Sequence, residues 1–186
     1  VWIPEHLYEP ERDRQYLKAV SPLDIGMGVY HLHVPALRSY IIYSASSNIV
    51  TAFKLAIPGI DVHCQHSVLA TEMLINRSSN HPLMLMNVRD GVADFEVCYG
   101  AQLLLSNSFK YGTSNERLYQ AIGIMKQFHI ETPDMELSIC GNVDRELFLQ
   151  LQHYFPNVTL YTGQPTTYLI PEFQTFPTYK HAMLLS

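Results

Sequence analysis

The chain lacks the charge pattern of a nucleic-acid-binding protein and the long apolar segments of a membrane protein. Charged residues make up only 16% of its 186 residues, and the formal net charge is -5, which does not favour a nucleic-acid partner. Lys and Arg form no basic cluster. The apolar runs are far shorter than the roughly 20 residues that a helix needs to cross a bilayer, so no membrane insertion is expected.

Cysteine is also scarce. The three cysteines, Cys64, Cys98 and Cys140, lie far apart in the sequence, and their odd number shows no paired spacing. This usage favours reduced, buried thiols over a disulfide framework. The first residues include Pro4 and Glu5 in place of an apolar stretch, so no secretory signal is expected. We therefore predict a cytoplasmic protein.

The second half of the sequence contains a clear order of elements. Residues 83–87 are predicted to form a buried strand, 93–99 an alternating strand and 102–109 a third strand, with turns between them. A helix, a strand, a helix and a strand follow at 113–128, 137–140, 145–155 and 158–161. This order is the layout of one lobe of the actin-like ATPase (ribonuclease H-like) fold, an α/β fold of two lobes whose mixed sheets are flanked by helices.

Both helices in this half have a recognisable start. Thr113 and Glu116 have the spacing of a capping box, in which each side chain bonds the other's backbone. Asp144 is a typical N-cap residue before the helix at 145–155.

The first half predicts a smaller α/β unit. Its expected elements are helices at 11–19, 49–57 and 67–75 and strands at 29–34, 40–43 and 60–64. The polar run 76–80 is typical of a linker. We therefore assign 1–78 to the remainder of a first lobe and 79–186 to a second lobe, which ends in an extended tail from Thr162.

Four short motifs carry a resemblance to a known family. They are the segments 3–8 (IPEHLY), 109–113 (FKYGT), 137–142 (LSICGN) and 154–158 (YFPNV). Through them essentially the whole chain resembles a bacterial family of unknown function, DUF3822, which is similar in fold to the actin, hexokinase and chaperone ATPases. It is especially similar to the actin-like scaffold proteins of pilus assembly. The resemblance implies a first lobe without its opening hairpin, the part that carries a phosphate loop.

The resemblance also implies where a nucleotide would bind. ATPases of this fold hold phosphates with a hairpin of the form Asp-x-Gly-Gly-Gly-Thr-Thr-Asp-Phe, which corresponds to residues 87–95 (NVRDGVADF). Asn87 replaces the leading carboxylate, while Arg89 and Asp90 replace two glycines. An amide is a poor substitute for an anionic metal partner, and an added carboxylate repels phosphate. The pattern therefore indicates an eroded site.

A site that binds ATP with Mg²⁺ is the alternative to a site that binds no cofactor. By the resemblance, a nucleotide between the lobes would contact Asn87, Arg89, Asp90, Gly91, Gly141 and Asn142, where the last two replace the Gly-Gly pair on the adenosine side.

Each of these residues also has a simpler interpretation. Asp90-Gly91 is the typical sequence of a plain hairpin turn, which needs no ligand. Arg89 either holds an anion or is a solvated turn residue, and the second is favoured. Asp94 and Glu96 share one face of a strand, as the metal ligands of a nuclease would, but a solvent-exposed face explains them more simply.

Two further motifs are weak. One motif is a cluster at a predicted strand end, formed by His63, Cys64 and His66, and His31 and His33 also share a strand face. A zinc site needs four converging ligands, so ordinary partly buried side chains are favoured. Residues 24–28 (DIGMG) lack the preceding strand and following helix of a nucleotide loop and are interpreted as a turn.

Our leading hypothesis is a non-catalytic, degenerate actin-like module that binds a protein partner. An ATP-binding or weakly hydrolysing protein is the alternative, and a metal-dependent nuclease ranks below both. Because fold does not fix function, the scaffold role rests on analogy alone.

Overall fold

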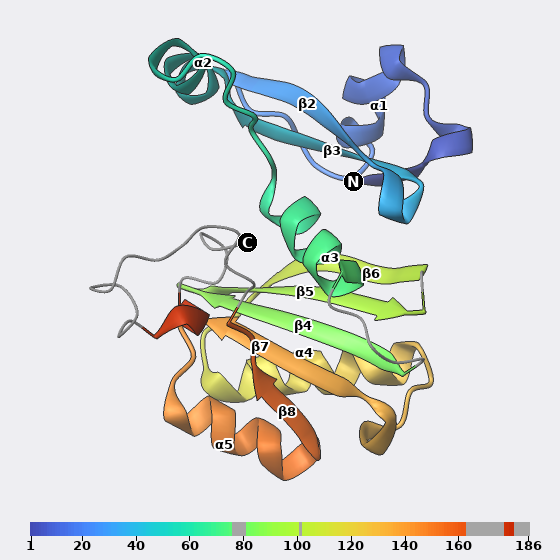
Figure 1. The fold of residues 1–186 in the computed structure, drawn as a ribbon, viewed down its shortest axis with the longest axis vertical. Coiled ribbons are helices and arrows are strands. Elements are labelled where there is room, and N and C mark those ends of the chain that lie inside the picture. Colours follow the sequence, from blue (N-terminus) through green and yellow to red (C-terminus); the bar gives the residue numbers. More distant parts are fainter. Residues whose placement is uncertain (76–80, 101, 163–176, 181–186) are drawn as a thin grey trace. The chain divides into compact units, whose positions relative to one another are not determined.

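The computed structural model describes residues 1–75, 81–100, 102–162 and 177–180. The chain divides into two compact units, Val1–Ser67 and Val68–Ser186 (Figure 1). The predicted linker 76–80, and with it the predicted boundary between lobes after residue 78, lies outside the described residues and stays a prediction. The same holds for most of the predicted tail. In the described part of the chain no helix has the length and apolar character needed to span a membrane.

The first unit is built on a small antiparallel sheet. Its strand order is β1-β3-β2, with bounds β1 Trp2–Pro4, β2 Met27–Val34 and β3 Ser39–Ser46. The helices are α1 Asp13–Lys18 and α2 Ser47–Ala56, with short 3-10 turns at Glu5–Leu7, Pro10–Arg12 and Pro35–Leu37. Helix α1 packs against β2 and β3. The predicted turn at 24–28 is shorter in the structure: residues 25–26 form a turn, and Met27 and Gly28 already belong to β2.

The predicted strand at 60–64 is wrong. These residues carry the alternating pattern of a strand but form no ladder, although a hydrogen bond from Tyr43 Oη to the carbonyl of Val62, at 2.6 Å, anchors them. A strand exists only beside a neighbour that accepts its backbone hydrogen bonds. No described strand lies beside 60–64, and helix α3, Gln65–Ile75, begins directly after them.

The second unit contains the predicted meander and the two following strand–helix pairs. Its sheet has the order β6-β5-β4-β7-β8, in which β4, β5 and β6 are antiparallel and β7 and β8 run parallel to β4. The strands are β4 Pro82–Arg89, β5 Val92–Tyr99, β6 Gln102–Lys110, β7 Glu136–Gly141 and β8 Asn157–Leu160. The helices are α4 Ser114–Gln127 and α5 Arg145–Tyr154, with a 3-10 turn at Thr132–Asp134.

The two helix starts were predicted with different success. Asp144 is the N-cap of α5, and its Oδ1 accepts a hydrogen bond from the backbone N–H of Leu147 at 2.7 Å. Thr113 is the N-cap of α4, but its side chain makes no capping bond, and Glu116 instead accepts from the N–H of Gly112 at 2.8 Å. Neither bond of the predicted capping box is therefore formed, although α4 begins after Thr113 as predicted.

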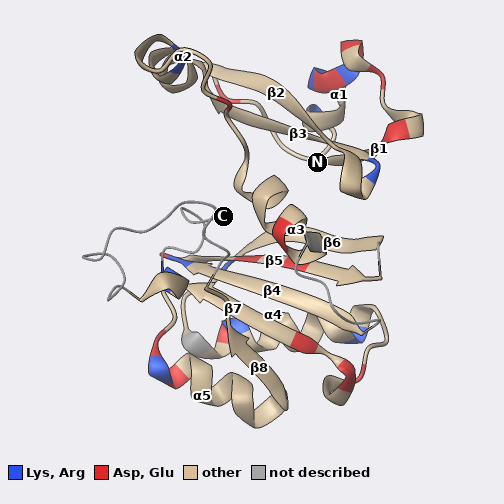
Figure 2. Cartoon of the chain, in the orientation of Figure 1, with Lys and Arg blue, Asp and Glu red and all other residues tan. Residues whose placement is uncertain are grey.

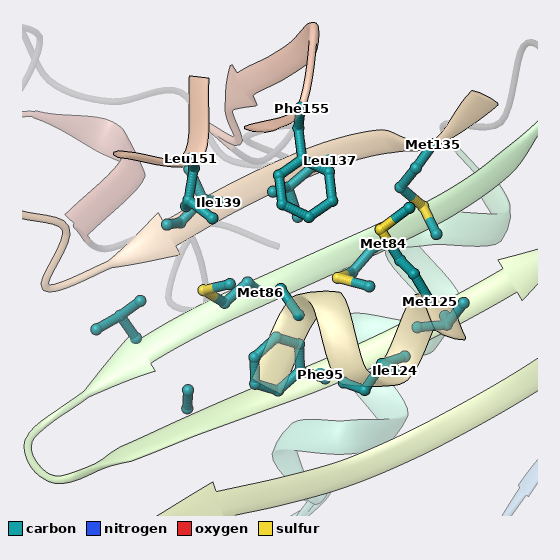
Figure 3. Packing of buried hydrophobic residues seen from close by; sticks show 14 of the residues in the cluster. Met84, Met86, Phe95, Ile124, Met125, Met135, Leu137, Ile139, Leu151 and Phe155 are labelled. Carbon is teal, nitrogen blue, oxygen red and sulfur yellow. The ribbon is translucent and has the colours of Figure 1, made fainter. Parts of the chain in front are cut away.

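The sheet of the second unit is buried on both faces. On one face, side chains of β4, β5 and β7 pack against α4 and α5, with Met86, Phe95 and Ile139 among the fully buried ones (Figure 3). On the other face a smaller cluster includes Leu69 and Met73 of α3. Strand alternation assigns consecutive residues to opposite faces. Polar residues of β4 and β5 that share the α3 face are consequently buried as well.

Candidate functional site

The hairpin between β4 and β5 has a two-residue turn. Arg89 pairs with Val92 in the ladder, and Asp90 and Gly91 lie between them. Gly91 has a φ of 67°, a left-handed conformation that glycine adopts without strain. The local sequence thus explains the turn without any ligand, as the simpler interpretation predicted.

Arg89 and Asp94 form an ion pair on this hairpin. Arg89 Nε donates to Asp94 Oδ2 at 2.8 Å and Arg89 Nη2 donates to Asp94 Oδ1 at 2.7 Å. The pair is therefore bidentate, the strongest geometry for a guanidinium and a carboxylate. The side chain of Asp94 is 1% exposed and that of Arg89 is 47% exposed. Arg89 is an exposed residue beside the turn, as the favoured interpretation expects, but it also binds Asp94, which the sequence did not predict.

Two neutral side chains complete the surroundings of Asp94. Asn87 Nδ2 donates to Asp94 Oδ2 at 3.0 Å, and Ser108 Oγ of β6 donates to Asp94 Oδ1 at 2.6 Å. Burial alone would raise the pKa of Asp94. The hydrogen bonds from Arg89, Ser108 and Asn87 and the charge of Arg89 outweigh burial and hold the pKa of Asp94 below its usual value. Asp94 is therefore ionised and compensated inside the protein.

The predicted solvent-exposed face of β5 is wrong for both of its acidic residues. Asp94 and Glu96 are both fully buried, and Glu96 Oε1 accepts a hydrogen bond from Ser106 Oγ at 3.0 Å. The cause is the coverage of the sheet on both faces, which turns an alternating strand into a fully buried one. Asp94 accepts hydrogen bonds from both neighbouring strands, β4 and β6, and the bond from Ser106 to Glu96 comes from β6.

The end of β7 packs directly against the same hairpin. The backbone N–H of Asn142 donates to the carbonyl of Val88 at 2.7 Å, and Asn142 Nδ2 donates to Asp90 Oδ1 at 3.3 Å. Gly141 has a φ of 84°, and a Cβ at this position would collide with the carbonyl oxygen of Val88. The structure therefore brings the two halves of the predicted site together, but in close mutual contact.

The thiol of Cys140, the residue before Gly141, lies buried beside Asn87 of β4. Its Sγ is 3.4 Å from Asn87 Oδ1, and the residue is fully buried. Burial, together with the negative charge of Asp94, raises the pKa of Cys140 to about 12. The thiol is therefore protonated at neutral pH and is a weak nucleophile.

Sequence reasoning missed a second layer of residues around the hairpin. Tyr111 Oη donates to the carbonyl of Arg89 at 2.6 Å, and the Tyr111 N–H donates to the carbonyl of Gly91 at 3.0 Å. The guanidinium of Arg117 lies 4.7 Å from the centre of the Tyr111 ring and bonds Asp144 Oδ2 at 3.0 Å. The motif FKYGT contains Tyr111, which was the only available signal.

The second layer of residues also affects the pKa of Asp144, at the start of α5. The hydrogen bond from the Leu147 N–H is the largest influence and lowers the pKa of Asp144. Burial opposes it, while the bond from Arg117 and its charge add to the lowering. Asp144 thus stabilises both the helix start and the nearly buried guanidinium of Arg117, whose side chain is 5% exposed.

The histidine motifs do not gather into a site. His31 Nδ1 is 2.7 Å from Asp13 Oδ2, and His33 Nε2 is 3.6 Å from Glu5 Oε1, so each histidine contacts a different carboxylate. Among residues 1–75, 81–100, 102–162 and 177–180, no three or more His, Cys, Asp or Glu side chains gather in a group that can hold a metal ion.

The hydrogen bonds around the hairpin favour a closed hairpin over one that binds an anion. The guanidinium that would attract a phosphate already binds Asp94 through two charge-assisted bonds. The carbonyl of Val88 and the carboxylate of Asp90 are engaged by Asn142. The site is therefore a junction at which hydrogen bonds and one ion pair hold β4, β5 and β7 together.

Comparison with known proteins agrees with this architecture. The family model described as "Protein of unknown function (DUF3822)" matches residues 1–158. A crystal structure from Bacteroides thetaiotaomicron, a protein with an actin-like ATPase fold and unknown function, is similar with a TM-score of 0.78 and 21% sequence identity. The match covers 86% of this chain but only 63% of that one, less than two thirds. The curated proteins include no match. The predicted actin-like ATPase fold is confirmed.

Proposed function

Because the chain belongs to the DUF3822 family and has an actin-like ATPase fold, we propose that it is a non-catalytic, degenerate actin-like module that acts as a protein-binding scaffold. The observation that carries this proposal is the ion pair between Arg89 and Asp94 in the hairpin that holds phosphates in ATPases of this fold.

The energetics of that ion pair argue against phosphate binding. A phosphate that recruited Arg89 would leave Asp94, which is 1% exposed, as a buried carboxylate without its counter-charge. Removing one partner of a buried pair costs about 3–5 kcal/mol, and the half-exposed position of Arg89 lowers that figure only in part. The phosphate would also meet the carboxylate of Asp90 at the turn. Both effects oppose a nucleotide.

The backbone of the hairpin supports the same conclusion. In a phosphate loop, glycines leave room for an anion to approach backbone N–H groups. Here Gly141 instead lets β7 approach the carbonyl of Val88, and the Asn142 N–H bonds that carbonyl at 2.7 Å. The conformational freedom of Gly141 therefore allows β7 to pack against β4.

Exposed apolar residues of α2 support a role in protein binding. Ile49, Phe53, Leu55 and Ile57 on and just after α2 are each more than half exposed, and Lys54 is the one charged residue of the helix. Exposed apolar clusters of this kind typically mark interaction surfaces on soluble domains. The surface is on the first unit, whereas the closed hairpin belongs to the second unit.

One observation favours the alternative of an ATP-binding protein. The six residues that the resemblance points to gather at one end of β4, β5 and β7, as a nucleotide site between two lobes would require. In this alternative Asn87, Asp90 and Asn142 would lie near ATP and Mg²⁺. The bidentate pair of Arg89 with Asp94 weighs against it.

Calorimetric titration of the full chain with Mg-ATP separates the two functions. We expect no saturable heat at millimolar nucleotide from protein whose circular dichroism shows it to be folded. The matched variant is Asn142→Ala, since its side chain bonds Asp90 at an exposed position outside the hydrophobic core. Saturable binding that weakens in Asn142→Ala would establish the ATP-binding alternative instead.

A second experiment tests the scaffold itself. An Ile49→Ser, Phe53→Ser double variant removes apolar area from the exposed face of α2, and Leu149→Ser provides a control at an exposed apolar residue of α5. We expect the first variant to lose a partner protein that the unchanged chain and the control both retain in affinity purification. Equal retention by all three would remove α2 as the binding surface.

A further inference from the structure

Two histidines of β2 face two carboxylates of the N-terminal segment. His31 and His33 are two positions apart on β2 and therefore lie on one face of the sheet. Residues 5–18, which include helix α1, place Asp13 and Glu5 against these histidines. Figure 2 shows Asp, Glu, Lys and Arg on this segment and none on β2 or β3. A positive charge on a side chain of β2 can therefore come only from its histidines.

The closer of the two pairs joins His31 to Asp13. His31 Nδ1 lies 2.7 Å from Asp13 Oδ2, which is hydrogen-bond distance. The side chain of Asp13 is 17% exposed and that of His31 is 47% exposed. Arg12, the neighbour of Asp13 in the chain, pairs with Glu9 at 2.9 Å. A carboxylate that is largely removed from water depends on a nearby positive charge, and protonated His31 supplies that charge.

The second pair joins His33 to Glu5 and is looser. His33 Nε2 lies 3.6 Å from Glu5 Oε1, and the two side chains are 35% and 49% exposed. Ion pairs that water reaches to this extent contribute little to stability. The second pair therefore adds to the first pair with a smaller contribution.

Two tyrosines also contact the histidine rings. The ring centre of Tyr8 lies 5.6 Å from that of His31, and the ring centre of Tyr40 lies 4.5 Å from that of His33. Tyrosine as a residue type loses its proton only near pH 10. Burial and the neighbouring carboxylate of Asp13 raise the pKa of Tyr8 still further. Of the residue types gathered here, only histidine changes its charge between about pH 5.5 and about pH 8.

The attachment of this segment to the sheet depends on tertiary contacts. Helix α1 has six residues, too few for a helix that is stable alone. Leu17 is its buried residue, and the ring of Tyr8 stacks on that of Tyr40 at 3.7 Å. The backbone N–H of Glu5 donates to the carbonyl of Arg38 at 2.9 Å. A change in the two histidine–carboxylate pairs therefore changes how firmly the segment is held.

From this arrangement we propose that residues 5–18 form a pH-sensitive strap, which charged His31 and His33 hold on the sheet of the first unit and which loosens when they lose their protons. A carboxylate stabilises the charged form of a histidine. This contribution is therefore present below the ordinary histidine pKa of about 6.5 and is lost as the pH rises through the titration of the histidines. Loosening exposes Leu17 and the rings of Tyr8 and Tyr40. The inference concerns the first unit alone and does not rest on the proposed scaffold function.

Amide hydrogen exchange of the full chain, followed by nuclear magnetic resonance at about pH 5.5 and about pH 8, tests the strap. The reporter is the backbone N–H of Ala19, which donates to the carbonyl of Gln15 at 3.1 Å at the end of α1. Its protection factor, which is corrected for the intrinsic effect of pH on exchange, is expected to fall about fivefold, the factor of one good ion pair. The N–H of Phe155, bonded to the carbonyl of Leu151 at 2.8 Å in the second unit, is the reference and should change much less. Equal protection of Ala19 at both pH values would overturn the proposal.

A matched pair of variants assigns the effect to the histidine–carboxylate contact. Asp13→Asn removes the charge of the carboxylate but keeps the size of the side chain, so we expect the protection of Ala19 to become nearly independent of pH. His6→Gln is the control, because it removes an exposed histidine of the same segment. We expect His6→Gln to retain the fivefold fall. A fall that persists in Asp13→Asn, or one that disappears in His6→Gln, would contradict the strap.

A third variant covers the case in which Asp13→Asn prevents the segment from folding. His31→Gln changes the other partner of the same pair, on β2, and its amide can still donate to Asp13. Because glutamine carries no charge at either pH, we expect the protection of Ala19 to lose most of its pH dependence. An unchanged fivefold fall in His31→Gln would show that another group causes the effect and would overturn the proposal.

Discussion

Arg89 and Asp94 face each other across the β4–β5 hairpin, with the guanidinium bonded to both carboxylate oxygens at 2.7 and 2.8 Å. The two residues are five positions apart in the sequence, one at the end of β4 and one inside β5. In the ATPases that this fold resembles, the corresponding hairpin holds phosphate. Here the hairpin's own cation, Arg89, binds its buried anion, Asp94, and this pair is the main physical argument against phosphate binding.

The coupling between these residues is measurable as a double-mutant cycle. Arg89→Ala is expected to lower the free energy of unfolding by about 2 kcal/mol, less than for a fully buried pair because water reaches the half-exposed Arg89. The same substitution in the Asp94→Asn background is expected to cost much less, since no buried charge remains. Urea denaturation of the four proteins checks this. Equal costs in both backgrounds would show that the pair contributes nothing.

The same pair predicts how stability depends on pH. The pKa of Asp94 is lower in the folded protein than its unfolded value of about 3.9. The stabilisation is therefore complete above that value and disappears as the pH falls through the lower, folded pKa. We expect Asp94→Asn to reduce this acid dependence of the urea midpoint between about pH 5 and 2, with Asp144 supplying the remainder. An unchanged acid profile in Asp94→Asn would contradict the lowered pKa.

Two glycines offer a matched test of the junction between β7 and the hairpin. Gly141→Ala introduces a Cβ that collides with the Val88 carbonyl at a φ of 84°, so we expect a loss of stability of at least about 1–3 kcal/mol. Gly123→Ala lies in α4, where a Cβ meets no atom within 4 Å, and should stabilise by about 0.5–1 kcal/mol. Thermal unfolding compares the two. Similar effects at both sites would rule out the close packing at Gly141.

The cysteines should differ in reactivity. Cys140 is fully buried and its pKa is raised to about 12, and Cys98 is also buried, whereas Cys64 is only half-buried. Because the thiolate is the reactive form, we expect a thiol reagent to modify Cys64 first in the folded protein. All three should react after denaturation. Mass spectrometry of the labelled peptides distinguishes the sites, and early labelling of Cys140 would indicate that the junction opens readily.

Local signals were sufficient to predict the architecture of the second unit. The turn at Asp90-Gly91, the alternation along 93–99 and the cap at Asp144 each determine a boundary within a few residues, and their order specifies a meander followed by parallel strands. The segment 60–64 failed for the opposite reason. Its pattern is that of a strand, but pairing depends on a neighbour far away in the sequence, which no local pattern reveals.

The chemistry of the site was harder to predict than its location. The resemblance to the family implied that Asn87, Arg89 and Asn142 lie near one another, and the structure places them at one end of β4 and β7. Sequence reasoning could not foresee that Asp94 is buried and held by Arg89 and by Ser108, because burial of a carboxylate depends on what covers the sheet and on donors from another strand. Tyr111 and Arg117 were missed for the same reason.

The measurement that tests the central claim most directly is a nuclear magnetic resonance titration of the labelled full chain with Mg-ATP. It follows the backbone amides of Gly91 and Asn142, which lie on the two sides of the closed junction. The account predicts that neither amide signal moves in a saturable way at millimolar nucleotide. Saturable movement of both signals with one common dissociation constant would show that the junction opens to bind nucleotide, and would contradict the account.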